Sequence, residues 1–175
     1  VLVHAIEYAS FGFKESGYHI VNVLIHLANT LLVFYVIRKL SNHLWIGLIT
    51  ALIFGIHPLH VESVAWVSEL KDLLYTLFFL LSLLAYLRFM DQQKYKWYGM
   101  ALAFFVLSAL SKGMAVTLPV VLVLVDYFKG RPLNQKVWIE KIPFFIFAFV
   151  FGIVAIYAQQ SEAALHADSI PVMQR

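Results

Sequence analysis

The sequence contains no cysteine, and this absence excludes disulfide bonds and thiolate metal sites. Charged residues are also scarce, at 13% of the chain, which is far below the level of ordinary soluble domains. No glycine-rich phosphate loop, internal repeat or low-complexity linker is present. These absences exclude a disulfide scaffold and a phosphate-loop nucleotide site.

Apolar residues dominate what is present. Hydrophobic side chains make up 62% of the chain, and the mean hydropathy of +0.81 is typical of proteins that cross a membrane several times. Six segments approach the ~20 apolar residues that span a bilayer. They are residues 20–37, 44–57, 72–90, 97–111, 114–128 and 138–158. We therefore expect an all-α fold, a polytopic membrane helical bundle of about six transmembrane helices. Since none of the six has the charged start and small-residue cleavage site of a signal peptide, we expect all of them to stay in the membrane.

The fourth and fifth segments are expected to form a hairpin. Residues 97–128 carry one charge, Lys112, near their middle, and a single straight helix of this length would exceed the ~30 Å hydrocarbon core. We place the turn at residues 111–113. Pro119 then lies within the second arm, where neighbouring helices can satisfy the freed carbonyl.

The basic residues predict an orientation, because Lys and Arg accumulate in short cytoplasmic loops. If Arg38 and Lys39 face the cytoplasm, alternation of the spans places most other basic residues there as well. These are Arg88, Lys94, Lys96, Lys129, Arg131, Lys136 and Lys141. Most acidic residues fall on the other face, so the net charge of +3 reflects topology, and no nucleic-acid partner is expected.

The two ends of the chain are more polar than its middle. Residues 1–17 are too short and too charged to span, and we expect an amphipathic interfacial segment on the non-cytoplasmic face. Residues 159–175 read as a polar non-cytoplasmic tail. Because the chain starts at Val1 without methionine, we interpret it as a piece of a longer protein.

A polar stripe runs along the first span. His19, Asn22, His26 and Asn29 follow one another at steps of three, four and three, which places them on one face of a helix. For His26 and Asn29, deep in the span, we favour hydrogen bonds to neighbouring helices over a catalytic role. His19, at the outer end, is a candidate substrate contact.

The motif HPLH at residues 57–60 interrupts the apolar pattern at the expected outer surface. Pro58 restricts His57 and ends the second span there. His57, His60 and Glu62 then permit three interpretations: a divalent metal site, a purely structural turn, or a site for phosphate or substrate. The spacing of the two histidines differs from that of the helical zinc motif, which disfavours the metal.

A charged cluster opens the third span. Glu69, Lys71 and Asp72 lie at a helix N-terminus, whose dipole favours an anion. Lys112 arrives at the same face from the hairpin, so these groups can together hold a phosphate. The simpler interpretation is that Lys71 pairs with Asp72 while Lys112 extends to the interface.

Three segments in order resemble a known family: residues 17–34 (GYHIVNVLIHLANTLLVF), 57–89 (HPLHVESVAWVSELKDLLYTLFFLLSLLAYLRF) and 111–128 (SKGMAVTLPVVLVLVDYF). They resemble the membrane part of the protein O-mannosyltransferase-like proteins that carry C-terminal tetratricopeptide repeats. That family belongs to the GT-C glycosyltransferases. The resemblance implies a polyprenyl- or dolichyl-phosphate sugar donor, used on the non-cytoplasmic face.

The resemblance also implies inverting transfer of a sugar to a protein hydroxyl, with an acidic base on the first outer loop. We expect that loop upstream of Val1, so the catalytic residue is unknown here and Glu7 is not assigned the role. The repeats are expected beyond Arg175. This chain has Gly113 where relatives carry Pro or Glu after the lysine, which predicts a looser turn.

Our hypothesis from the sequence is a GT-C-like membrane glycosyltransferase fragment that transfers a mannose-like sugar to an acceptor protein among membrane lipids. The predicted donor-binding residues are His19, His57, His60, Glu62, Lys71, Asp72 and Lys112.

No cofactor is certain, and a divalent metal stays open. The alternative is a non-catalytic membrane anchor for a repeat domain, whereas a transporter is disfavoured because buried charges at depth are few. The sequence of residues 111–127 resembles bacterial proteins, and this resemblance favours a bacterial inner membrane over the endoplasmic reticulum.

Overall fold

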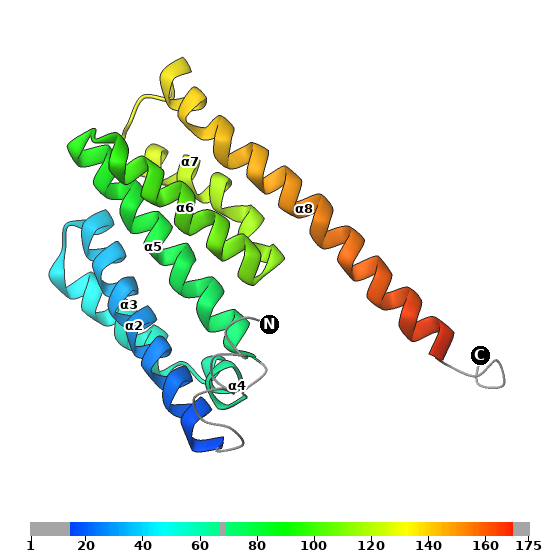
Figure 1. Cartoon of the computed structure of the whole chain (residues 1–175). Helices are drawn as coiled ribbons and strands as arrows, with labels where there is room; N and C mark the ends of the chain where they lie inside the picture. Colours follow the sequence, from blue (N-terminus) through cyan, green and yellow to red (C-terminus); the bar gives the residue numbers. More distant parts are fainter. Residues whose placement is uncertain (1–14, 67–68, 170–175) are drawn as a thin grey trace.

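The computed structural model describes residues 15–66 and 69–169, with side chains for 17–66 and 69–160. Within these residues the fold is all-α, as predicted, and contains no strand. The elements in chain order are α2 (Glu15–Ser41), α3 (Leu44–Ile56), α4 (His60–Ala65), α5 (Leu70–Gln92), α6 (Tyr95–Ser111), the 3-10 helix η2 (Gly113–Thr117), α7 (Leu118–Phe128) and α8 (Gln135–Ser169) (Figure 1). Most of the predicted interfacial segment, residues 1–14, lies outside the described residues.

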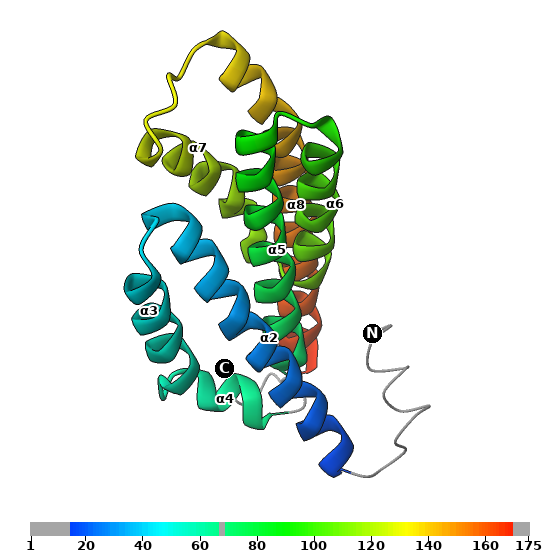
Figure 2. The same cartoon turned by 90° about the vertical axis from the view of Figure 1, so that its left-hand side faces the viewer.

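The long helices alternate in direction, so the bundle has two distinct ends. α2, α5 and α7 finish at the end drawn uppermost in Figure 1, where α3, α6 and α8 begin. We call this the basic end, because it gathers the basic residues assigned above to the cytoplasmic face. The opposite end carries α4, which lies across the base of the bundle (Figure 2), and we call it the α4 end.

Polar contacts join the helices at the basic end. Lys39 Nζ lies 2.7 Å from Asp91 Oδ2, which links the last turns of α2 and α5. Lys129 Nζ donates to the carbonyl of Lys39 at 2.7 Å and so connects α7 to α2. The alternation of spans used to place the charges therefore matches the arrangement of the helices, whereas the side of the membrane that each end faces stays a prediction.

Aromatic and aliphatic side chains of α5, α6, α7 and α8 form the core. Phe105 and Phe144 are fully buried, with ring centroids 5.7 Å apart. Leu118 and Leu122 of α7 pack into the same cluster. The hairpin of α2 and α3 packs closely at Gly47, where a Cβ would lie 3.1 Å from Arg38 Cβ. Small residues permit such close approach of membrane helices.

In the described part of the chain, three helices are long and apolar enough to cross a membrane by length and composition: Gly17–Ser41, Leu70–Gln92 and Gln135–Gln160. α3, with 13 residues, extends only about 20 Å at ~1.5 Å per residue, and the apolar stretch Gly113–Phe128 is also short. The six predicted segments thus correspond to six helices of unequal length. The chain is a membrane protein.

The predicted hairpin turn is confirmed, but the place of its proline is corrected. α6 ends at Ser111, Lys112 is extended, and η2 follows before α7. Pro119 was expected inside the second arm with a freed carbonyl to satisfy; instead it occupies the first turn of α7. A proline costs no helical hydrogen bond there, because the first amides of a helix have no partner within it.

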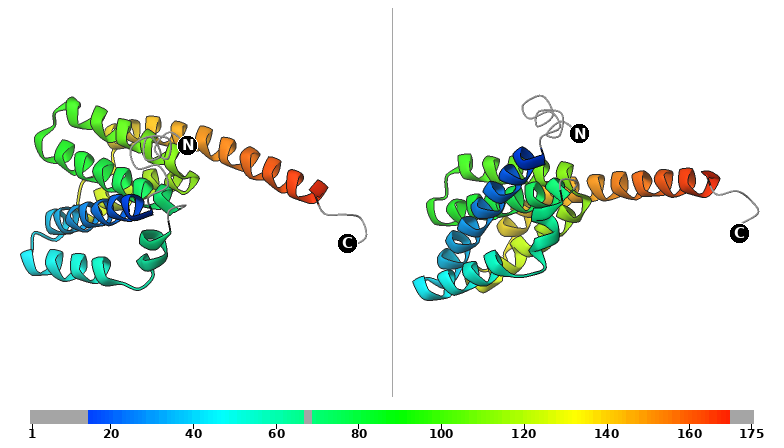
Figure 3. Two further views of the ribbon diagram at one scale, coloured as in Figure 1. Left: turned by 60° about the horizontal axis from the view of Figure 1, so that its bottom comes forward. Right: turned by 90° about the horizontal axis from the view of Figure 1, so that it is seen from below.

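α8 is the longest helix and continues beyond Ala158 to Ser169. It packs on α6, α7 and η2, and its C-terminal half then projects away from the bundle (Figure 3). Large apolar side chains on it are exposed, among them Phe149 at 71%, which is the pattern of a helix surrounded by lipid.

Candidate functional site

A polar cavity of about 330 Å³ opens at the α4 end between α2, α4, α5 and the turn after α6. α2 contributes His26 and Asn29, and α4 contributes His60. α5 contributes Asp72, and Lys112 closes the wall from the turn. Four segments, spread from α2 to the turn after α6, therefore place ionisable and amide groups around one space. We call it the polar cavity.

The ion pair between Asp72 and Lys112 is the central electrostatic feature of the polar cavity. Lys112 Nζ lies 2.6 Å from Asp72 Oδ1, and both side chains are about a quarter exposed, at 30% and 26%. Asp72 thus pairs with Lys112 and not with its neighbour Lys71, which corrects the simpler interpretation given above. The pair is neutral overall, so the positive charge predicted for this site is smaller than the sequence indicated.

The polar stripe of α2 makes the cross-helix hydrogen bonds that we favoured for it. His26 Nε2 lies 3.0 Å from the carbonyl oxygen of Gly55 on α3. Asn29 Nδ2 donates to the Leu73 carbonyl on α5 at 3.0 Å, and Asn22 Nδ2 donates to the Val64 and Trp66 carbonyls at 3.2 Å. The cross-helix hydrogen bonds predicted for His26 and Asn29 are confirmed.

Asn29, which lines the polar cavity, also has one polar atom without a hydrogen-bond partner. Its side chain is fully buried, and its Oδ1 accepts no hydrogen bond from any residue that the structure describes. A buried acceptor without a donor is costly, commonly by about 1–3 kcal/mol. A ligand hydroxyl in the cavity would remove that cost.

His60 separates the polar cavity from a second, mostly apolar cavity of about 330 Å³. Its ring centroid lies 5.5 Å from that of His26 and 6.3 Å from that of His57. His19 and His57 line the second cavity. The three predicted histidines thus gather at the α4 end, and His60, like His26, lines both spaces.

The environment of His60 favours its neutral form. Partial burial is the main cause and lowers the pKa of His60 from its ordinary value of 6.5, and the charges of His26 and His57 lower it further. His60 is therefore suited to accept or donate a hydrogen bond as a neutral imidazole.

Two predicted site residues lie apart from both cavities. Glu62 and Lys71 are exposed, and neither lines the polar cavity or the second cavity. Among the side chains that the structure places, no group of three or more histidine, aspartate or glutamate residues is arranged to hold a metal ion. The HPLH turn itself forms as predicted, with α3 ending at Ile56 and α4 beginning at His60.

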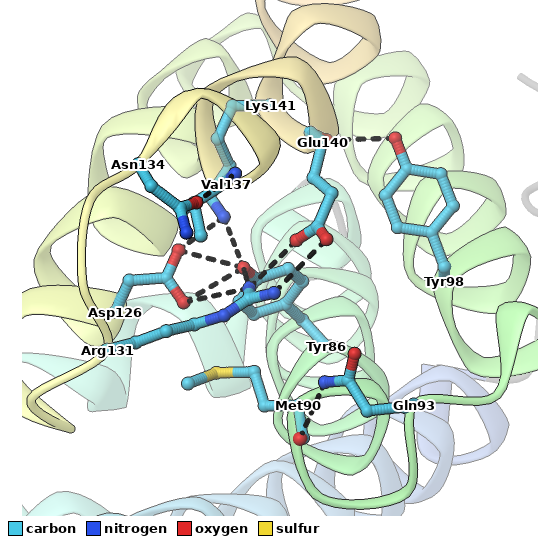
Figure 4. Close-up of polar contacts among 10 residues, drawn as sticks. All are labelled: Tyr86, Met90, Gln93, Tyr98, Asp126, Arg131, Asn134, Val137, Glu140 and Lys141. Atoms are coloured by element: carbon cyan, nitrogen blue, oxygen red, sulfur yellow. Dashed lines mark hydrogen bonds and ion pairs between the residues drawn. The ribbon is translucent and has the colours of Figure 1, made fainter.

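A buried ionic network at the basic end was missed by the sequence analysis (Figure 4). Lys141 Nζ donates to Tyr86 Oη and to Asp126 Oδ2. Arg131 Nη1 lies 2.8 Å from Glu140 Oε2 and donates to Tyr86 Oη at 3.1 Å. Two cations and two carboxylates therefore surround one tyrosine hydroxyl, which itself donates to Asp126 at 2.8 Å.

Tyr86, Asp126 and Lys141 are almost completely buried, so this network holds α5, α7 and α8 together rather than offering a surface. The sequence predicts Arg131 and Lys141 as cytoplasmic loop charges and assigns Asp126 no role. The only signal in the sequence was an aspartate at the end of a long apolar run, since a charge in that position needs a partner.

Comparisons with known proteins agree on a family. Residues 2–158 match the family described as dolichyl-phosphate-mannose-protein mannosyltransferase. The protein O-mannosyl-transferase Tmtc2 of Drosophila melanogaster is 35% identical over 125 residues, which is 68% of this chain and 13% of that protein. The protein O-mannosyl-transferase tmtc2 of Xenopus laevis is 32% identical over 168 residues, or 88% of this chain and 20% of that protein. No solved structure matches.

The chain thus spans only 13% and 20% of the length of these two relatives. Both are animal proteins, as is the protein O-mannosyl-transferase TMTC1 of Homo sapiens, which is 34% identical over 93 residues, 53% of this chain and 10% of that protein. These relatives give no support to the bacterial membrane favoured from the sequence. The match over most of its length, together with the helical membrane fold, shows that the chain belongs to the dolichyl-phosphate-mannose-protein mannosyltransferase family.

Proposed function

We propose that this chain is the central membrane part of a glycosyltransferase. The whole protein would transfer a mannose-like sugar from a polyprenyl- or dolichyl-phosphate donor to a hydroxyl of an acceptor protein on the non-cytoplasmic face. The polar cavity would bind the sugar-phosphate head of that donor. The observation that supports this most is the convergence of Lys112, Asp72, His60 and Asn29 on one space at the end of the bundle opposite the basic end.

The size and lining of the polar cavity suit a sugar phosphate. A volume of about 330 Å³ is near the lower limit of small-molecule sites, which range over ~300–1,000 Å³. Asn29 Oδ1 would accept a sugar hydroxyl, and Ser63 and Thr76 bring further hydroxyl groups to the wall. The family match supports mannose as the sugar.

Lys112 is the residue that we assign to the phosphate. An ammonium group has three N–H donors, and Asp72 accepts from Lys112 Nζ with one of its oxygens. The carboxylate therefore fixes the position of Nζ, while other N–H groups point away from it. A cation fixed in this way stabilises charge that develops on a departing phosphate, because no reorganisation is needed as the bond breaks.

The reaction itself divides the roles among donor, acceptor and protein. The acceptor hydroxyl oxygen attacks the anomeric carbon, the bond from that carbon to the phosphate oxygen breaks, and the electron pair stays on the phosphate. The hydroxyl proton passes to a base. Asp72 is a poor candidate for that base, because its charge is already committed to Lys112. We propose that the base lies elsewhere in the whole protein.

The second cavity would take the first part of the lipid chain of the donor. Apolar side chains such as Val23, Val61 and Val64 line most of it. It adjoins the polar cavity through His26 and His60, which line both. His19 and His57 at its edge would contact the donor where the lipid meets the phosphate.

The test uses the full-length protein in membranes, with dolichyl phosphate carrying labelled mannose and a candidate acceptor protein. Lys112→Ala should reduce label transfer about a hundred-fold, the usual effect of removing one preorganised donor. The matched control is Lys94→Ala, which removes an exposed lysine at the basic end. Both variants must insert and accumulate like the wild type. Undiminished transfer by Lys112→Ala would exclude the assigned role, and absence of transfer by the wild type would favour the non-catalytic anchor.

A further inference from the structure

A groove between α2 and α5 lies at the basic end, away from the polar cavity. Its volume is about 680 Å³. Leu32, Tyr35 and Leu81 form apolar walls within it, and Arg38, Lys39 and Arg88 stand at its rim. Arg38 and Lys39 lie in the last turn of α2. The groove is therefore apolar along the helices and cationic at the membrane surface.

The two arginines at this rim have uncompensated charge. Arg38 Cζ lies 5.9 Å from the Phe34 ring centroid, and Arg88 Cζ lies 4.8 Å from that of Trp97. Neither guanidinium forms an ion pair with a carboxylate that the structure describes. The third cation, Lys39, is paired with Asp91 at 2.7 Å. The rim thus keeps two full positive charges, both on exposed side chains.

The spacing along the helices matches the layout of a phospholipid. Leu32 precedes Arg38 by six residues and Leu81 precedes Arg88 by seven, which at ~1.5 Å per residue separates wall from rim by about 10 Å on each helix. A phosphate bound at the rim would therefore have the upper part of an acyl chain beside the leucines. Arginine suits this role because its planar guanidinium pairs with phosphate through two parallel hydrogen bonds.

We propose that this groove binds one anionic membrane phospholipid, with its phosphate between Arg38 and Arg88 and one acyl chain along the apolar walls. Charge complementarity identifies the occupant, because two unpaired cations above a lipid-facing apolar surface attract anionic headgroups and not zwitterionic ones. The inference does not rest on the proposed transferase activity, since the groove and the polar cavity lie at opposite ends of the bundle.

The experiment measures lipid retention by the full-length protein. The protein is reconstituted in phosphatidylcholine with added phosphatidylserine and extracted gently, and the bound lipids are counted by native mass spectrometry. The wild type should retain phosphatidylserine in preference to phosphatidylcholine. The double variant Arg38→Ala with Arg88→Ala should lower that preference roughly thirty-fold, from the usual contribution of two basic residues.

Two further variants make the result specific. Lys94→Ala with Lys136→Ala removes the same charge from exposed positions at the basic end, outside the groove, and should leave the preference unchanged. Leu32→Trp fills the apolar wall without changing charge and should displace the lipid. An equal loss in both charge variants, a filled groove that still holds phosphatidylserine, or no preference in the wild type would each overturn the proposal.

Discussion

Lys112 Nζ lies 2.6 Å from Asp72 Oδ1, and this contact joins residues 40 positions apart. It links the turn after α6 to the first turn of α5, beside the histidines that α2 and α4 supply. The polar cavity thus forms only when α5 and α6 pack as a hairpin. A change that loosens this packing should therefore also disturb the position of Lys112 in the cavity.

We expect the Asp72–Lys112 pair to stabilise the fold as a unit. Asp72→Asn and Lys112→Met should each destabilise the protein, because each leaves a largely buried charge without its partner. The double variant should cost less than the sum of the single changes, with a coupling of about 1 kcal/mol. Unfolding of the purified protein in detergent measures these values, and strict additivity would show that the contact contributes nothing to stability.

The Tyr86 hydroxyl at the centre of the buried network should contribute more to the free energy of unfolding than an exposed tyrosine hydroxyl does. Tyr86→Phe removes the group that bonds to Asp126, Arg131 and Lys141 and should cost about 1–3 kcal/mol of unfolding free energy. Tyr95→Phe removes a hydroxyl from a side chain that is 76% exposed and serves as the control. Equal unfolding temperatures for the two variants would contradict this prediction.

Gly113 is expected to be required for the packing of α8 against the turn after α6. A Cβ at Gly113 would lie 2.9 Å from Ala155 Cβ, so Gly113→Ala should destabilise the protein by about 1–3 kcal/mol through overpacking. Gly99→Ala meets nothing within 4 Å and should stabilise α6 by roughly 0.5–1 kcal/mol. Thermal unfolding should show a lower unfolding temperature for Gly113→Ala and a higher one for Gly99→Ala. A Gly113→Ala variant more stable than the wild type would be inconsistent with this packing.

Acidification should weaken the α4 end through His60. The pKa of His60 is lowered in the folded state by burial and by the charges of His26 and His57, so the unfolded chain binds more protons below about pH 6.5. Stability should therefore fall as the pH drops from about 7 through 6.5. His60→Gln should reduce this slope, which unfolding temperatures at a series of pH values measure. An unchanged slope would assign the acid sensitivity to other groups.

The sequence was sufficient for most of the fold. Apolar run lengths predicted the helices, Pro58 predicted the end of α3, and the single charge at Lys112 predicted the turn of the hairpin. These features are local, because a run of hydrophobic residues or one proline determines them without reference to the rest of the chain. Pro119 was misplaced because the 3-10 helix before it has no signal in the pattern.

Partners across the bundle were harder to predict. Lys71 was as reasonable a partner for Asp72 as Lys112, since sequence spacing gives the face of a helix but not the side chain opposite to it. The network around Tyr86 shows the same limit, because its members come from α5, the end of α7 and the start of α8. Each looked like an isolated residue until the helices were placed together.

The neutral pairing of Asp126 with Lys141 has a consequence for how the protein is made. The two residues are 15 positions apart on consecutive antiparallel helices, so each charge has its counterion within one α7–α8 hairpin. Neither helix then presents an unpaired ion to its surroundings, which is unfavourable wherever water is scarce. The hairpin is thus suited to leave the translocation channel as one piece during synthesis, with its salt link already formed.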